Sequence, residues 1–268
     1  MKVVILCGGR GTRLGEITGS AIPKPMVKIG EEPMLWHIMD LYSRAAHHEF
    51  ILCVGHLSWS IKEYFLNFRA QRSDLQISTG EPTIVRFLSV PPTSSWDVTI
   101  AETGADTMTA GRLRRVAKYL DDDNFMLTYG DGVSDVDLNG LLAFHQAHGK
   151  MITMTGVIPP ARFGELAVVG EQVVEMSEKP QQTNRYINGG FMVVRRAFID
   201  AFIATDSDDI MLEREPFSAA AEAGEMMLYR HDGYWQCMDT MRDWELLNRL
   251  WKTGAAPWRS APTWGNGR

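Results

Sequence analysis

The sequence VVILCGGRGTRL, residues 3–14, decides the fold of this chain. Residues 3–7 are apolar and begin with β-branched side chains, which predicts a strand buried on both faces of a parallel sheet. A glycine-rich loop, residues 8–14, follows without a gap. Because ligands in open α/β sheets bind outside the carboxyl ends of the strands, we expect a binding site at this loop.

The loop has the composition of a phosphate-binding segment. Glycines let the backbone approach a phosphate closely and turn its N–H groups inward, and Arg13 can add a charge-assisted hydrogen bond. The loop is not a Walker A loop, which ends in Gly-Lys-Ser/Thr. Nor is it a dinucleotide fingerprint, which needs a glycine where Leu14 stands. A tight turn that uses its glycines for geometry alone is the alternative interpretation of this motif.

Periodicity along the rest of the chain predicts strands that alternate with helices. We expect strands at residues 3–7, 50–54, 75–78, 84–90, 98–101, 125–129, 151–157, 166–169, 173–176, 191–194 and 226–230. We expect helices at residues 34–46, 60–68, 112–120, 138–148, 214–223 and 240–251. This order indicates right-handed βαβ units and an α/β fold. Its Rossmann-like, mixed but mainly parallel sheet is flanked by helices and carries small β-rich elaborations, all in a single domain.

Composition limits the classes of partner. The chain has 268 residues, 45% of them hydrophobic, and a formal net charge of -6, which argues against nucleic acid and membrane surfaces. The apolar N-terminal stretch runs directly into glycines, so we expect a core strand there and not a signal peptide. The three cysteines, Cys7, Cys53 and Cys237, share no CxxC spacing. We expect reduced, buried thiols in a cytoplasmic protein.

A second motif, Pro23-Lys24-Pro25-Met26, follows the glycine loop. The two prolines restrict the local backbone to an extended form and thereby hold Lys24 rigidly. A lysine held close to a phosphate-binding loop can neutralise charge at a reacting phosphorus. The combination of both motifs therefore favours a phosphate-transfer site over a solvated loop lysine.

Further blocks of sequence carry a resemblance to a known family. They are LWHIM (35–39), IKEYF (61–65), TGADTMTAGRLRRV (103–116), TYGDGVSDVD (128–137), PPARFGEL (159–166), EKP (178–180), INGGFMV (187–193), EREPF (213–217), WQCMDTMRD (235–243) and GAAPW (254–258). With the two motifs above, they make the chain similar to the sugar-1-phosphate nucleotidyltransferases. The GRLRRV, GDGVSDVD and WQCMDTMRD segments resemble the glucose-1-phosphate cytidylyltransferase subgroup in particular.

This resemblance implies a nucleotide-diphospho-sugar transferase fold and a specific reaction. A phosphate oxygen of glucose 1-phosphate would attack the α-phosphorus of CTP, giving CDP-glucose and pyrophosphate. The resemblance also implies Mg²⁺ as cofactor and a homo-oligomer, with a hexamer as the expected form. Residues 1–150 would form the nucleotide-binding core, residues 151–258 the sugar-phosphate part and residues 259–268 a tail.

Roles for individual residues follow from the same resemblance. Asp131, which stands at the carboxyl end of the strand predicted at 125–129, and Asp239 would ligate Mg²⁺. The catalytic residues would be Arg13, Lys24 and Asp131. We expect the nucleotide to contact Leu6, Gly8, Gly9, Gly11, Thr12, Arg13, Lys24, Thr103, Arg112 and Gly130. We expect the sugar phosphate to contact Glu178, Lys179, Asn188 and Gly189.

Other polar residues receive structural interpretations. We expect a turn role for Asp135, a helix N-cap for Asp137, solvated helix charges for Arg114 and Arg115, and surface charges for Arg195 and Arg196. The histidines at 47, 48, 145 and 148 lack a convincing third ligand for zinc.

Three alternatives to the function stay open. They are a related enzyme with another sugar phosphate or triphosphate, a non-catalytic nucleotide-sugar sensor, and a lectin-like module. The segment Gly19-Ser20-Ala21-Ile22 lacks the basic residue that usually precedes PKPM in the family, which bears on nucleotide affinity and base choice.

Overall fold

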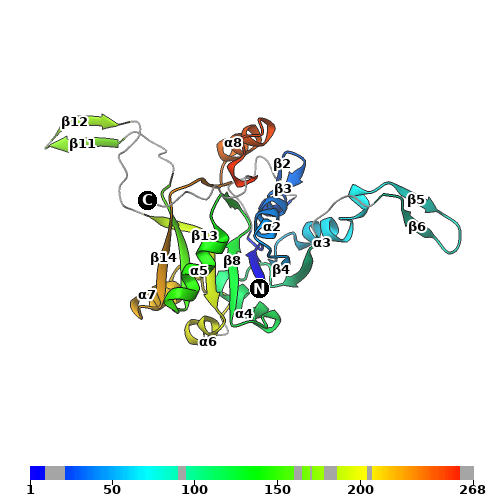
Figure 1. The fold of residues 1–268 in the computed structure, drawn as a ribbon, viewed down its shortest axis with the longest axis horizontal. Helices are drawn as coiled ribbons and strands as arrows, with labels where there is room; N and C mark the ends of the chain where they lie inside the picture. The colour runs from blue at the N-terminus through cyan, green and yellow to red at the C-terminus, as the bar shows by residue number, and fades with distance from the viewer. Residues whose placement is uncertain are drawn as a thin grey trace.

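The computed structural model describes residues 1–9, 22–89, 95–159, 165–169, 171–177, 186–203 and 207–259. A seven-stranded sheet in the order β14-β10-β13-β8-β1-β4-β7 lies at its centre (Figure 1). The strands are β1 (Val3–Leu6), β4 (Glu49–Val54), β7 (Asp97–Glu102), β8 (Asn124–Tyr129), β10 (Ile152–Val157), β13 (Ile187–Arg195) and β14 (Met226–His231). Strand β13 pairs antiparallel with β8 and β10, whereas the other pairs are parallel. The predicted mixed, mainly parallel sheet is confirmed.

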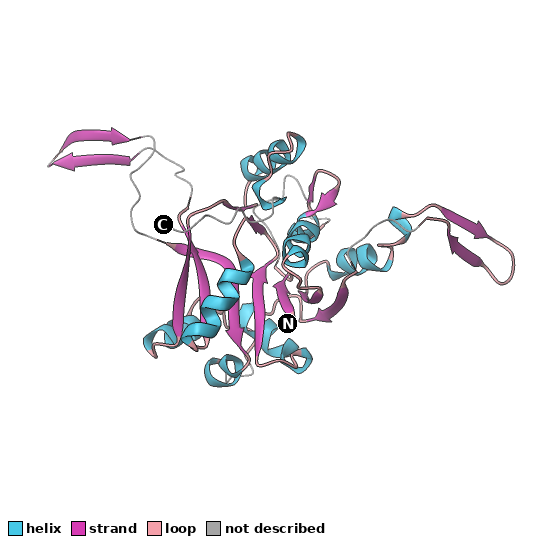
Figure 2. Ribbon diagram, in the orientation of Figure 1, coloured by secondary structure: helices cyan, strands magenta, loops and turns pink. Residues whose placement is uncertain are grey.

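Helices cover both faces of this sheet, as Figure 2 shows. They are α2 (Met34–Arg44), α3 (Ser58–Leu66), α4 (Thr109–Val116), α5 (Leu138–His148), α6 (Ala197–Phe202), α7 (Glu215–Glu222) and α8 (Met241–Lys252). Along β1, Val3 and Ile5 pack into a core shared with α2, while Val4 and Leu6 pack into a second core shared with α4. The strand is therefore buried on both faces, as its apolar sequence predicts. Helix α6 was not predicted, because two turns give too short a pattern.

Four two-stranded pairs form the β-rich elaborations. They are β2 (Lys28–Ile29) with β3 (Glu32–Pro33), β5 (Leu75–Ser78) with β6 (Ile84–Phe87), β9 (Gly132–Ser134) with β15 (Trp235–Cys237), and β11 (Glu165–Val169) with β12 (Gln172–Ser177). The hairpin β5–β6 extends away from the central sheet (Figure 1). The β9–β15 pair escaped the sequence analysis, because each strand has only three residues. It is the pair that positions the site described below.

The thiols of Cys7 and Cys53 are free and buried, as predicted. Burial raises the pKa of the Cys53 thiol to about 12, so this sulfur is an unreactive core atom. Cys237 is free and only half-buried. Among the helices that the structure describes, none has both the length and the apolar character required to cross a membrane.

Candidate active site

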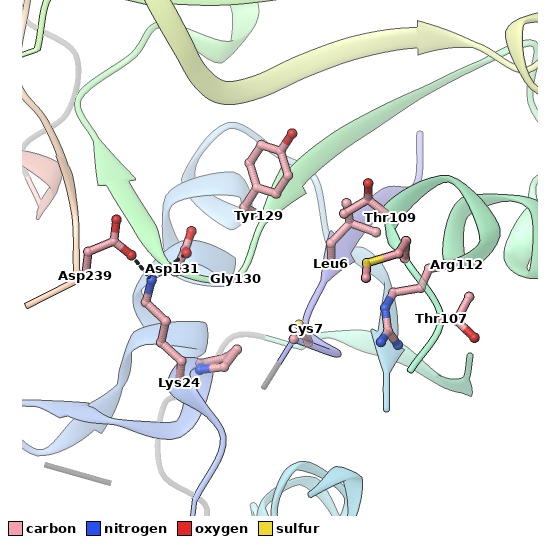
Figure 3. Close-up of a pocket in the computed structure, with 13 residues that line it drawn as sticks. Leu6, Cys7, Lys24, Thr107, Thr109, Arg112, Tyr129, Gly130, Asp131 and Asp239 are labelled. Carbon is pink, nitrogen blue, oxygen red and sulfur yellow. Dashed lines mark hydrogen bonds and ion pairs between the residues drawn. The ribbon is translucent and has the colours of Figure 1, made fainter. Parts of the chain in front are cut away.

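A cleft of about 450 Å³ opens where strands β1 and β8 end. The two strands run parallel with Leu6 opposite Tyr129, and the Gly130 amide donates to the Leu6 carbonyl at 3.1 Å. The segments that follow both strands therefore begin side by side. The cleft is lined by Leu6, Cys7, Gly9, Lys24, Pro25, Thr107, Met108, Thr109, Arg112, Tyr129, Gly130, Asp131 and Asp239 (Figure 3).

The predicted site residues divide by where the structure places them. Those that line the cleft are Leu6, Gly9, Lys24, Arg112, Gly130, Asp131 and Asp239. Those described that do not line it are Gly8, Thr103, Asn188 and Gly189. Those outside the described residues are Gly11, Thr12, Arg13, Glu178 and Lys179.

Close packing at Gly130 explains why a glycine precedes the first predicted metal ligand. A Cβ atom there would lie 2.9 Å from Pro25 Cγ and 3.2 Å from the Leu6 carbonyl oxygen. Any larger residue would push the Lys24–Pro25 segment away from the end of β8. The glycine thus keeps Lys24 within reach of the carboxylate at position 131.

The Lys24 ammonium lies between two carboxylates. Its Nζ atom is 2.7 Å from Asp131 Oδ2 and 2.5 Å from Asp239 Oδ1 (Figure 3). Pro23 is extended, as predicted, with φ -72° and ψ 148°. The extended form predicted for the rest of the segment is wrong, because Lys24–Met26 form one turn of 3-10 helix with Pro25 buried. Three side chains from residues far apart in the chain meet at one point of the cleft.

Charge in this cluster favours the ammonium form of Lys24. Burial alone lowers the pKa of Lys24, but the neighbouring carboxylates of Asp131 and Asp239 outweigh it and raise that pKa above its ordinary value. Lys24 therefore carries its positive charge throughout the physiological pH range. The cation that the two carboxylates hold in the described structure is the Lys24 ammonium itself.

Backbone pairing fixes the two carboxylates relative to each other. Cys237 pairs with Gly132 in the β9–β15 ladder, and the Met238 amide donates to the Asp131 carbonyl at 2.8 Å. The segments that precede Asp239 and follow Asp131 are thus neighbours in a sheet. This arrangement brings residues 131 and 239 together although 107 positions separate them.

The donor set at this point fits Mg²⁺. Mg²⁺ is usually held by one or two carboxylates together with substrate phosphates and waters. Asp131 and Asp239 supply two carboxylates that already converge on one cation, the Lys24 ammonium. In the described part of the chain, no group of three or more His, Cys, Asp or Glu side chains is arranged as a closed metal site. The two carboxylates lie in the wall of a cleft, so other positions around a bound cation would be open to a ligand.

Arg112 holds the start of the glycine loop. Its guanidinium is buried and donates to the Gly8 carbonyl at 2.9 Å, to Thr103 Oγ1 at 2.7 Å and to the Val54 carbonyl at 3.2 Å. Thr103, which is fully buried, donates in turn to the Val54 carbonyl at 2.7 Å. Arg112 lines the cleft, whereas Thr103 does not. Both residues tie the ends of β1 and β4 to helix α4.

Arg115 is an exposed helix charge, as expected, but it also forms an ion pair that was not predicted. Its guanidinium donates to the Thr103 carbonyl at 2.6 Å and to both carboxylate oxygens of Asp208 at 2.9 and 2.7 Å. The side chain is therefore a structural link between α4 and the segment before α7. A helical charge pattern could not reveal this, because the partner lies 93 residues further along the chain.

Tyr129, in the cleft wall, connects the cleft to strand β13. Asn188 Nδ2 donates to Tyr129 Oη at 3.2 Å, and Tyr129 Oη donates to Glu213 at 2.5 Å. Thr109, also in the cleft wall, donates to the same carboxylate at 2.8 Å. Tyr129, Glu213 and Thr109 were not predicted as site residues, although each stands within a block that carries the family resemblance.

Asp137 has the N-cap role predicted for it, whereas Asp135 makes long-range contacts instead of the predicted turn. Asp137 caps helix α5 by accepting from the Gly140 amide at 2.9 Å. Asp135 accepts from the Tyr234 amide at 2.7 Å and pairs with His231 at 2.9 Å. Neither lines the cleft.

The fold and the site define a nucleotide-binding α/β protein with an open two-carboxylate centre. The model of the nucleotidyl transferase family matches residues 2–245, and the chain belongs to this family.

Individual relatives agree with this assignment. The chain is 46% identical to the glucose-1-phosphate cytidylyltransferase of Salmonella typhi over 97% of this chain and 99% of the relative. It is 41% identical to a Bacillus subtilis protein named "Probable glucose-1-phosphate cytidylyltransferase", over 97% of this chain and 99% of the relative. The solved structure of HddC from Yersinia pseudotuberculosis, complexed with GMP-PN, matches with a TM-score of 0.65 and 20% identity. It covers 93% of this chain and 99% of that chain, and it shows the shared fold.

Proposed function

We propose that the chain transfers a cytidylyl group from CTP to α-D-glucose 1-phosphate in a Mg²⁺-dependent reaction that yields CDP-glucose and pyrophosphate. The observation that carries the chemistry is the convergence of Lys24, Asp131 and Asp239 in the cleft at the end of β1. The choice of CTP and glucose 1-phosphate is supported by 46% identity to the Salmonella typhi enzyme of that name.

The proposed reaction is an in-line displacement at phosphorus. An oxygen of the sugar phosphate forms a bond to the α-phosphorus, while the bond from that phosphorus to the pyrophosphate oxygen breaks and pyrophosphate keeps the electron pair. A phosphate monoester has its second pKa near ~6, so the nucleophile is already largely dianionic at neutral pH. The site therefore needs no general base and acts by positioning and by neutralising charge.

Lys24 is proposed to exchange partners during this cycle. Bound to Asp131 and Asp239, Mg²⁺ would neutralise the triphosphate and polarise its phosphorus–oxygen bonds. Because the Lys24 ammonium occupies the same two carboxylates, it must release at least one of them to a competing cation. The released ammonium stays in the cleft, where we propose that it contacts the α-phosphate. The amides of the glycine loop and Arg13 would hold the remaining phosphates.

The sugar phosphate is proposed to bind near the start of β13. Asn188 and Gly189 stand there, and Asn188 is hydrogen-bonded to the cleft residue Tyr129. Glu178 and Lys179 are proposed to complete this side, with Lys179 on the phosphate. In this division, residues 1–150 bind the nucleotide and residues 151–258 bind the sugar phosphate.

The test is pyrophosphate release with glucose 1-phosphate and each of CTP, UTP, dTTP, ATP and GTP, with and without Mg²⁺. We expect the highest kcat/KM with CTP and no turnover without a divalent cation. The variant Asp131→Asn is measured in the same assay, and we expect it to lose turnover. Asp137→Asn is its matched control, because it makes the same change outside the cleft. Preference for another triphosphate would move the assignment to a related pyrophosphorylase. A lack of turnover with every triphosphate would favour the nucleotide-sugar sensor.

We also propose that the protein is a cytoplasmic homo-oligomer, with a hexamer as the expected form. In hairpin β5–β6, the cross-strand pairs Leu75–Phe87 and Ile77–Val85 share one face. Ile77 is 55% exposed and Val85 is 49% exposed, although an isolated hairpin is marginally stable in water. A second copy of the chain would cover this face. The free thiols of the chain fit a reducing compartment.

Sedimentation of hairpin variants tests the oligomer. We expect wild type to sediment as an oligomer and the double variant Ile77→Asp/Val85→Asp to dissociate. Ser78→Asp, on the opposite face of the same hairpin, is the control and is expected to leave the assembly intact. A monomeric wild-type protein would contradict this proposal.

A further inference from the structure

We infer that Asp243 is a positioning residue whose buried carboxylate holds the backbone of Asp239 in the orientation that cation binding requires. This inference rests on the proposed role of Asp239 as a Mg²⁺ ligand. Asp243 is 7% exposed and lies in the first turn of helix α8, outside the residues that line the cleft. It acts through the chain segment that carries Asp239.

Part of the geometry is an ordinary helix cap. Thr240 is the N-cap of α8, and its hydroxyl accepts from the Asp243 amide at 3.3 Å. The Asp243 carboxylate accepts from the Thr240 amide at 2.9 Å, which completes a capping box. These two bonds satisfy backbone donors at the helix start and concern the stability of α8.

The carboxylate of Asp243 does more than the cap requires. The same oxygen, Oδ2, also accepts from the amide of Asp239 at 3.1 Å, one residue before the cap. The other oxygen, Oδ1, accepts from Gln236 Nε2 at 2.9 Å. Both oxygens are therefore used to fasten residues on either side of the turn that presents Asp239.

Gln236 links this arrangement to the second carboxylate. It is 5% exposed and pairs with Val133 in the β9–β15 ladder, two residues after Asp131. One buried carboxylate thus connects the start of α8, the turn at Asp239 and the strand next to Asp131. A shift of the Asp239 backbone would move one carboxylate of the site away from the other.

Replacing Asp243 by asparagine tests the hydrogen bonds of the carboxylate while leaving the volume of the side chain nearly unchanged. The amide has nearly the same size, but its NH₂ group would have to face either the Asp239 and Thr240 amides or the Gln236 side-chain amide. A donor would then meet a donor at a buried position, and at least one contact would be lost. The turn that carries Asp239 is expected to move in this variant.

The experiment measures Mn²⁺ binding by the loss of the EPR signal of free Mn²⁺, on the full chain in the presence of α,β-methylene-CTP. Loss of a residue that orients a metal ligand typically weakens metal binding by about 10–100-fold, and we expect Asp243→Asn to fall in this range. The Mg²⁺ concentration for half-maximal turnover should rise in parallel. Gln236→Met carries the test if Asp243→Asn does not fold, because it leaves Asp243 in place and removes the bond to Oδ1 together with the bond to the Cys237 carbonyl. We expect the same direction with a smaller change.

Asp137→Ala is the matched control, because it removes an aspartate cap from helix α5 outside the cleft. It should lose thermal stability yet bind Mn²⁺ as wild type does. If Asp243→Asn folds and binds Mn²⁺ as tightly as wild type, the inference is overturned while the proposed function stands. If Asp243→Asn does not fold, wild-type Mn²⁺ affinity in Gln236→Met has the same consequence. Equal weakening in Asp137→Ala would also overturn it. Undiminished Mn²⁺ binding in both Asp131→Asn and Asp239→Asn would refute the metal site, and the inference would fall with it.

Discussion

Replacing Lys24 by methionine removes one charge and keeps a side chain of similar length. The Lys24 side chain is 12% exposed, and its partners Asp131 and Asp239 are 36% and 25% exposed. Hydrogen bonds to charged groups contribute about 1.5–3 kcal/mol each in buried settings, and exposure and screening reduce this. We therefore expect Lys24→Met to lower the free energy of unfolding, in the absence of divalent cations, by about 1–3 kcal/mol in total.

The same variant should respond to Mg²⁺ in the opposite direction. Wild type must break an ion pair of Lys24 before a cation can bind Asp131 and Asp239, whereas the variant need not. If that step costs about 1.4 kcal/mol, Mg²⁺ binding without nucleotide becomes about tenfold tighter. Turnover should nevertheless fall by about 10²–10³-fold, the usual effect of losing one group that stabilises a charged transition state.

The assay combines urea unfolding with and without Mg²⁺, calorimetric Mg²⁺ titration, and pyrophosphate release. Lys28→Met is the control, because Lys28 is an exposed lysine four residues away in the same segment. It should change none of the three measurements. Unchanged Mg²⁺ affinity together with normal turnover in Lys24→Met would refute the competition between lysine and metal.

Three further predictions follow from the same contacts. Asp131→Asn should abolish measurable turnover while circular dichroism and cooperative unfolding stay close to wild type, and normal activity would exclude its role as a metal ligand. Burial lowers the pKa of Lys24, but Asp131 and Asp239 outweigh it and raise this pKa above its ordinary value of 10.5. The contribution of Lys24 to the free energy of unfolding is therefore complete below pH 10.5, and it is lost as the pH rises through the folded-state pKa. Urea unfolding of wild type and Lys24→Met should therefore converge only at strongly alkaline pH, and convergence near neutral pH would contradict this. Arg112→Lys should destabilise the chain by about 1–3 kcal/mol and raise the KM for CTP, because lysine cannot replace the bonds to Gly8 and its neighbours. An unchanged KM would argue against the role of Arg112 in holding the start of the glycine loop.

Much of the fold follows from local patterns in the sequence. The run VVIL predicts a strand buried on both faces, and the structure divides its side chains between two cores. The prolines around Lys24 restrict the backbone, and Asp137 caps the helix that it precedes. Such features depend on neighbouring residues, so the sequence shows them directly.

Long-range contacts were beyond the sequence analysis. The β9–β15 ladder joins two three-residue strands about 100 positions apart, and a pattern of that length predicts nothing on its own. The prediction for Arg112 came from the family resemblance and that for Arg115 from its helix position. Neither source tells whether a guanidinium faces ligand, backbone or a distant carboxylate. The family resemblance identified Asp131 and Asp239, whereas the tertiary structure shows that both meet Lys24.

The central claim is that the cleft joins glucose 1-phosphate to the α-phosphorus of CTP. ³¹P NMR of the protein with CTP, glucose 1-phosphate and Mg²⁺ tests it most directly. We predict that both substrate signals decline together, while the signals of pyrophosphate and of a pyrophosphodiester, CDP-glucose, grow in equal amounts. Release of inorganic phosphate without a new pyrophosphodiester, or no change in any signal, would contradict the proposed reaction.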